Sequence, residues 1–141
     1  MREILFRGKD IRGVWHIGLL AHIGNAWYIS NKAGVATAYE VIPTTIGQFT
    51  GLTAHGKKIF EGDIIRTDNG RKSAVSVVKY GNFRPKMIYD MFQECIGYSP
   101  KQYLHGVYCE SSKEQMMLFD SPTCIEVIGN IHDNPELLEV E

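Results

Sequence analysis

Apolar and polar residues alternate over short stretches of this chain, and turn residues interrupt the alternation every few positions. A period of two is typical of β-strands with one buried face. The N-terminal part therefore predicts an antiparallel meander, with a hairpin turn at Gly24–Asn25 and Pro43 ending its last strand. The predicted strands are Glu3–Gly8, Val14–Ala21, Asn25–Ser30 and Tyr39–Ile42.

The middle of the chain predicts further strands that bend sharply. Glycines break up Thr44–Thr53, so this segment is expected to be irregular. Lys58–Thr67 predicts extended pieces on either side of the Glu61–Gly62–Asp63 turn, and Ser73–Tyr80 predicts a further strand. Asp68–Asn69–Gly70 predicts the hairpin between them, because Asn-Gly tolerates the positive φ of a type I′ turn. This pattern indicates the first half of a small, strongly bent barrel.

The C-terminal part is less regular. Between Pro85 and Pro100 the apolar spacing fits a marginal helix or an excursion with a strand, and Lys101–Phe119 fits two short strands around Glu110–Lys113. Thr123–Ile131 predicts a closing strand with a bulge or bend at Gly129. Asn134 as N-cap and Pro135 at the first helical position predict a short helix, Pro135–Val140.

Together these elements predict an α+β fold that is mainly β. An N-terminal meander (residues 1–43) packs on a small SH3-like barrel (residues 44–141), which carries an insertion at about 84–122 and ends in the short helix. A chain of 141 residues is expected to form one compact domain, or two very small ones that share a core.

The charge balance and the cysteine content limit which partners and which cellular location are expected. The 15 basic and 16 acidic residues give a net charge of −1, which provides no global attraction to nucleic acid or anionic membranes. No signal peptide and no apolar run of about 20 residues are visible, so a membrane partner is not expected. The 3 cysteines are odd in number and widely spaced, which favours reduced thiols and a cytoplasmic location.

The sequence gives little indication of an active site or a metal site. The 5 histidines are scattered without tight His or Cys pairing, so no metal and no cofactor are predicted. No nucleophile-elbow motif is present, and an enzyme is not expected. The acidic turn Glu61–Gly62–Asp63 is interpreted as a corner between strands, and an active site there is the alternative. Asp133–Asn134–Pro135 is likewise interpreted as a helix cap.

One local patch fits nucleic acid. Around the 68–70 hairpin, basic side chains alternate with aromatic rings. Small barrels bind single-stranded nucleic acid with side chains of these two kinds. The alternative is a solvated hairpin tip whose charges prevent edge pairing. The candidate nucleic-acid residues are Arg66, Arg71, Lys72, Lys79, Tyr80, Phe83 and Arg84.

Self-assembly is the other binding hypothesis. Aromatic residues make up 11% of a chain with many strand edges to cover, and methionine and aromatic enrichment is typical of interface cores. Packing of the chain's own core is the alternative. The candidate interface residues are Met87, Met91, Phe92, Tyr98 and Tyr103.

Several segments resemble the YopX family of phage and prophage proteins from Gram-positive bacteria. The likeness is densest in FRGKD, Val41–Leu52, GKKIFEGDIIRT, VVKYGNF and the closing EVIGNIHDNPELL, while Arg84–Cys124 matches no motif. The resemblance implies a mainly β fold, a phage or prophage origin and a homo-oligomer, and it implies no catalytic residues.

We therefore expect a non-enzymatic phage accessory protein that self-assembles and acts by binding. Its partners would be itself and a phage or host protein. A nucleic-acid-binding barrel is the alternative.

Overall fold

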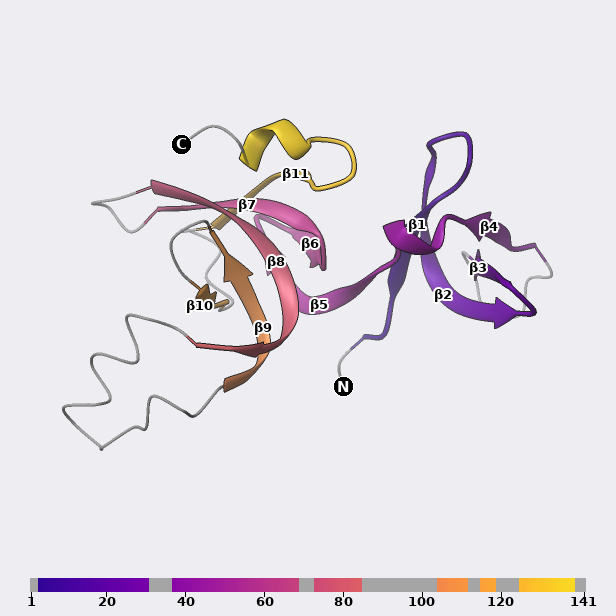
Figure 1. The fold of residues 1–141 in the computed structure, drawn as a ribbon, viewed down its shortest axis with the longest axis horizontal. Coiled ribbons are helices and arrows are strands. Elements are labelled where there is room, and N and C mark those ends of the chain that lie inside the picture. The colour runs from indigo at the N-terminus through magenta and orange to yellow at the C-terminus, as the bar shows by residue number, and fades with distance from the viewer. Residues whose placement is uncertain are drawn as a thin grey trace. The chain divides into compact units, whose positions relative to one another are not determined.

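The computed structural model describes residues 3–30, 37–68, 73–84, 104–111, 115–118 and 125–138. As predicted, the fold is mainly β, with antiparallel pairing in two sheets (Figure 1). Contacts divide the chain into two compact units. Unit 1 comprises Met1–Leu52 with Lys58–Phe60, and unit 2 comprises Thr53–Lys57 with Glu61–Glu141. The meander predicted for residues 1–43 falls within unit 1.

The first sheet has six strands in the order β4-β3-β2-β1-β5-β6. The predicted turn at Gly24 joins β2 to β3, and Gly24 has φ of 63°, as the first central position of a two-residue hairpin requires. The elements are β1 (Phe6–Lys9), β2 (Trp15–Ile23), β3 (Ala26–Ser30), β4 (Tyr39–Val41), the 3-10 turn η1 (Pro43–Thr45), β5 (Gly47–Ala54) and β6 (Lys57–Phe60).

The sheet of unit 1 curls until β4 returns to β1. The Ile42 N–H donates to the Lys9 carbonyl at 2.8 Å, although two strands separate β4 from β1 in the sheet. Gly8 makes this approach fit, because a Cβ there would lie 2.9 Å from the Cβ of Val41. The inside of the curl is the core of unit 1, with Ile29 and Val41 buried against Gly8.

The prediction of an irregular segment at Thr44–Thr53 is wrong over most of its length, since β5 covers Gly47–Ala54. Strand neighbours hold this glycine-rich stretch extended. The Phe49 N–H donates to the Leu5 carbonyl at 2.8 Å, and the Thr50 hydroxyl donates to the Ile59 carbonyl at 2.7 Å. Tertiary pairing therefore overrides the local preference of the glycines.

The second sheet has five strands in the order β10-β9-β8-β7-β11. Its described core includes Ile64 and Ile65 at 0% exposure and Val78 at 1%. The two strands expected around Glu110–Lys113 are present as β9 and β10. The strands are β7 (Asp63–Asp68), β8 (Ser73–Phe83), β9 (Leu104–Glu110), β10 (Gln115–Met117) and β11 (Ile125–Asn130).

The paired strands β8 and β9 are strongly curved (Figure 1), and two glycines face each other between them. Gly81 pairs with Gly106, and their φ values of 146° and 155° suit glycine rather than residues with a Cβ. Phe83 and Tyr108 lie four positions apart along this ladder, yet their rings stack at 4.9 Å. A straight strand would separate positions four apart by about 13 Å, so the bend brings the two rings together.

The predicted C-terminal helix Pro135–Val140 is wrong: the described segment is a 3-10 turn, η2 (Pro135–Leu138). Asn134 does not cap it with its side chain as predicted, because its Oδ1 accepts from the N–H of Asn130 at 3.3 Å. So short a segment lacks the length that an α-helix needs to be stable. The bulge predicted at Gly129 is confirmed, since the β11–β7 register shifts between Val127 and Gly129.

Two further predictions are not settled by these elements. The described strands of unit 2 form an ordered sheet with β10 and β11 at its edges, and closure into an SH3-like barrel stays a prediction. The helix or excursion predicted between Pro85 and Pro100 lies outside the described residues.

Candidate interaction surfaces

Two basic side chains of the predicted nucleic-acid patch pair with acidic side chains. Arg66 on β7 lies 3.7 Å from a carboxylate oxygen of Glu126 on β11. Lys79 on β8 pairs with Glu110 on β9, and this hydrogen bond, helped by one from Gln115, lowers the pKa of Glu110. Arg71 and Lys72 lie outside the described residues.

The aromatic residues of that patch separate into one buried and one exposed ring. Phe83 is 1% exposed and packs in the core, so it offers no surface for a base. Tyr80 is 54% exposed and meets His105 edge-on at 5.1 Å. His105 in turn donates from Nδ1 to Asn82 Oδ1 at 2.8 Å. Arg84 is exposed, and its backbone N–H donates to Gln115.

The interface proposed from methionine and aromatic content cannot be placed. Its residues lie outside the described part of the chain: Met87, Met91, Phe92, Tyr98 and Tyr103.

The acidic turn Glu61–Gly62–Asp63 forms the corner between β6 and β7. Gly62 has φ of 89°; its N–H donates to the Val78 carbonyl, and its carbonyl accepts from the Ile131 N–H, both at 2.9 Å. The corner thus joins β7 to strands on both sides. Asp63 is 2% exposed and therefore does not present a carboxylate to solvent.

A second set of turn residues follows β11. The Oδ1 of Asn130 accepts from the N–H groups of His132 and Asp133 at 3.0 and 2.9 Å. Asn134 folds back over Gly129, where an added Cβ would lie 2.6 Å from its Oδ1. The closing motif builds a tight corner, with Pro135 opening η2 after it.

A buried carboxylate, which the sequence analysis did not single out, fixes the β1–β2 hairpin tip in unit 1. One oxygen of Asp10 accepts from the N–H groups of Arg12 and Val14 at 2.9 and 3.0 Å. The other accepts from His16 Nε2 at 2.9 Å and from the Arg12 guanidinium at 3.1 Å. The hydrogen bond from His16, followed by those from Val14 and Arg12, holds the pKa of Asp10 far below its usual range.

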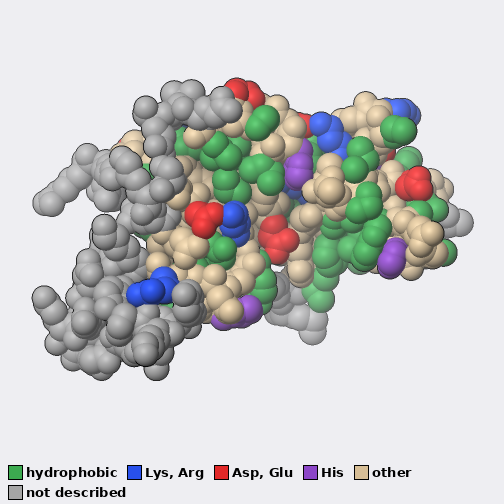
Figure 2. Space-filling view, viewed as in Figure 1, with side chains coloured by type: hydrophobic (Ala, Val, Ile, Leu, Met, Phe, Trp, Pro, Cys, Tyr) green, Lys and Arg blue, Asp and Glu red, His purple; other side chains and the backbone are tan. Residues whose placement is uncertain are grey.

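The outer face of β2 is apolar and exposed. Ile17, Leu19 and Ile23 alternate along the strand with 47%, 47% and 67% of their surface open, and Ala21 between them is also exposed. Figure 2 shows hydrophobic side chains gathered over the position of β2. The alternation of this strand was visible in the sequence, but not which of its faces would be covered.

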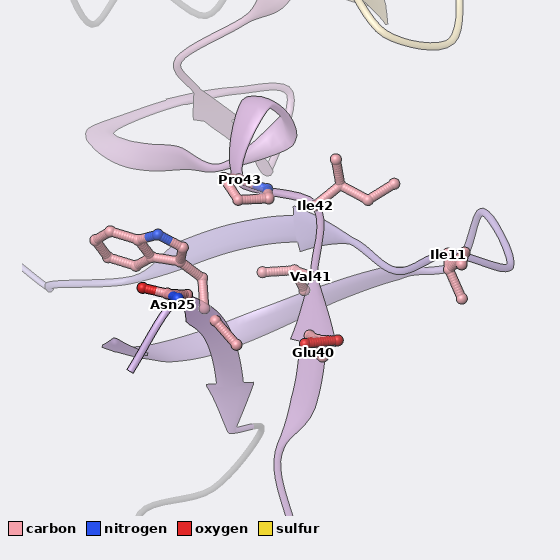
Figure 3. Close-up of a pocket in the computed structure, with 8 residues that line it drawn as sticks. Ile11, Asn25, Glu40, Val41, Ile42 and Pro43 are labelled. Atoms are coloured by element: carbon pink, nitrogen blue, oxygen red, sulfur yellow. The ribbon is translucent and has the colours of Figure 1, made fainter. Parts of the chain in front are cut away.

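A hollow of about 440 Å³ opens beside the hairpin tip of unit 1 (Figure 3). Its walls are mainly apolar, and Glu40 and Asn25 are its polar members. In Figure 3, Val41 and Ile42 lie between Ile11 on one side and Asn25 on the other. The described residues that line it are Ile11, Asn25, Ala26, Trp27, Glu40, Val41, Ile42 and Pro43.

A family model described as "YopX protein" matches residues 20–139, which is most of the chain. The chain belongs to the YopX family. A search of the curated proteins gave no match. The resemblance seen in the sequence is confirmed, and membership supplies a family but no activity.

The described residues of this YopX-family chain hold no cluster of metal-ligating side chains and no membrane-spanning helix. Among its described residues, no three His, Cys, Asp or Glu side chains come together as a metal site would require. None of its described helical segments is long and apolar enough to cross a membrane.

Proposed function

We propose that this YopX-family protein is a non-enzymatic accessory protein of a phage or prophage that self-assembles and acts by binding. The observation that carries the proposal is the outer face of β2. Large apolar side chains in a row on a sheet face that solvent reaches are unusual for a protein that functions alone. The row itself carries no charge, although Arg7 and Lys9 of β1 lie opposite Ile17 and Trp15 on the same face. An apolar row can pack against the same row of a second copy, as a twofold interface requires.

The polar groups of unit 1 support a binding role over a catalytic one. Asp10 and His16 resemble part of a catalytic arrangement, but both oxygens of Asp10 accept bonds that shape the hairpin tip. Their side chains are 7% and 8% exposed, so a substrate would have little access to them. The pair is therefore interpreted as a structural device that keeps the tip rigid.

Light scattering on a gel-filtration column tests self-assembly. We expect the unmodified chain to elute as a multimer, and a double variant, Ile17→Lys with Ile23→Lys, to elute as a smaller species. Each lysine would place a charge in an interface that excludes water, at a cost of several kcal/mol.

Ile4→Lys with Leu138→Lys is the matched control. These side chains are 61% and 37% exposed but lie outside β2, so the control should leave the multimer intact. A monomeric unmodified chain, or a control that dissociates as fully as the β2 variant, would contradict the proposal.

A further inference from the structure

The hairpin of β2 and β3 is exposed on both of its faces at the end that carries the turn. Its outer face there is the apolar face of β2 described above. On the opposite, inner face, exposure increases along β2 from His16 and Gly18, which are buried, through Leu20, which is partly exposed, to His22, which is exposed. The core of unit 1 therefore covers the inner face where β2 begins but not where it ends.

Trp27 lies on the part of the inner face that the core leaves open. It is paired with His22 across the two strands, so both side chains leave the sheet on that face. Their rings stack with centroids 3.9 Å apart and an angle of 3° between the planes, which fixes the orientation of the indole. Trp27 is partly exposed. A partner that covers an indole already held in place loses little conformational entropy, and tryptophan is enriched among the residues that dominate binding energy.

The hollow of about 440 Å³ lies against the same indole. Trp27 is paired with Val41 of β4, so these two side chains share the inner face, and both line the hollow. Val41 is 3% exposed and closes the hollow on the core side. Apolar side chains of a partner can therefore pack against Trp27 from within the hollow.

The partner that suits this hairpin end is a second copy of the chain. No Asp, Glu, Lys or Arg occurs between Arg12 and Lys32, so the hairpin brings no charge of its own that would repel the same hairpin of another copy. Each copy supplies both an apolar hairpin end and a hollow. In a twofold interface each copy can place its hairpin end against the hollow of the other, as the reciprocal contacts of such interfaces require.

We propose that a second copy encloses the end of the β2–β3 hairpin on both faces, with Trp27 as an anchor of the interface. The inference rests on the self-assembly proposed above and extends the contact from the outer face of β2 to His22 and Trp27 on the inner face. An interface limited to the outer face would leave Trp27 as accessible in the multimer as in the single chain.

Acrylamide quenching of fluorescence tests this enclosure. Trp15→Phe leaves Trp27 as the only emitter of the 2 tryptophans in the chain. We expect the Stern–Volmer constant of Trp27 to be several-fold lower in the multimer than in the dissociated chain that also carries Ile17→Lys and Ile23→Lys. Equal quenching of Trp27 in the multimer and in the dissociated chain would overturn the proposal.

A charge on the inner face provides a second test. His22→Asp changes an exposed side chain, so the core stays intact, and we expect it to weaken self-association about thirtyfold, the usual effect of losing an interface anchor. Light scattering over a dilution series measures this. His105→Asp, the same substitution at an exposed histidine of unit 2, is the matched control and should leave self-association unchanged.

The outcomes separate this inference from the proposal on which it rests. A multimer in which Trp27 stays open to acrylamide, or in which His22→Asp assembles as tightly as His105→Asp, refutes the enclosure alone. An unmodified chain that is a monomer in light scattering refutes self-assembly and the enclosure together.

Discussion

The exposed strand surfaces of the two units differ in their chemistry. In unit 1 the outer face of β2 carries Ile17, Leu19 and Ile23, open to solvent and without a charge among them. In unit 2 the exposed side chains of β8 and β9 are polar apart from the Tyr80 ring, and several bond to one another, as Lys79 does with Glu110.

This difference indicates which unit is better suited to associate with a partner. Exposed ion pairs contribute little to stability and make a surface soluble. Exposed apolar rows gain free energy only when something covers them. Unit 1 therefore has more to gain from a partner than the described face of unit 2 has.

The largest expected effect is a difference in stability between variants of two aromatic residues in unit 2, Phe83 and Tyr80. Phe83→Ala should destabilise unit 2 by about 3–5 kcal/mol, because it empties a core position and removes the stack on Tyr108. Tyr80→Ala should cost about 1 kcal/mol or less, because that ring is on the surface.

Urea unfolding followed by far-UV circular dichroism measures both variants. Both tryptophans belong to unit 1, so their fluorescence follows that unit separately. Similar losses for Phe83→Ala and Tyr80→Ala would refute the placement of Phe83 in the core.

The second-largest expected effect is a loss of stability in acid, which salt should change differently in the two units. The pKa values of Asp10 in unit 1 and of Glu110 in unit 2 are both lowered by folding, so each ionised carboxylate stabilises its unit above the pKa of the unfolded chain. That stability is lost in acid, as the pH falls from the unfolded pKa of each carboxylate through its lowered folded pKa.

Salt should distinguish the two carboxylates. Glu110 faces a lysine whose side chain is 46% exposed, whereas the Asp10 side chain is 7% exposed. Raising the salt from about 0.1 M to about 1 M shortens the Debye length from about 10 Å to about 3 Å, which weakens the exposed pair more. Melting curves from pH 5 to pH 2, with Asp10→Asn and Glu110→Gln as variants, measure this. Equal salt sensitivity of the two contributions would contradict the contrast between the units.

Much of the fold could be predicted because turns and strands are local. The Gly24 turn, the bulge at Gly129 and the strands on either side of Glu110 follow from glycine, asparagine and alternation. The strand β5 could not be predicted, because it is held by partners far away in the sequence, such as Leu5 and Ile59. The described C-terminal segment is a 3-10 turn of 4 residues, which is too short for a stable α-helix.

The candidate surfaces were harder to predict than the fold. Charge spacing indicated Arg66 and Lys79, but it could not show that Glu126 and Glu110 lie opposite them across the sheet. The hollow beside Ile11 arises only because the sheet of unit 1 curls and brings β4 back to β1. Such a site is defined by tertiary geometry, which alternation in the sequence does not encode.

The smallest expected effect is on the affinity for single-stranded nucleic acid. Since Arg66 and Lys79 bond to carboxylates and Phe83 is buried, we expect single-stranded oligo(dT) to bind no tighter than about 10⁻⁴ M at physiological salt, within the non-specific range. Fluorescence anisotropy measures this affinity. Glu110→Gln, which removes the carboxylate charge opposite Lys79, should raise the affinity by a few-fold at most.

The variant Arg71→Ala with Lys72→Ala decides between the two binding hypotheses. If the unmodified chain binds oligo(dT) tightly, with strong salt dependence, and this variant abolishes the binding, the basic hairpin is the functional surface of unit 2. Binding that is weak, and unchanged when both basic residues are removed, leaves the apolar face of β2 as the surface with the most free energy to gain from a partner.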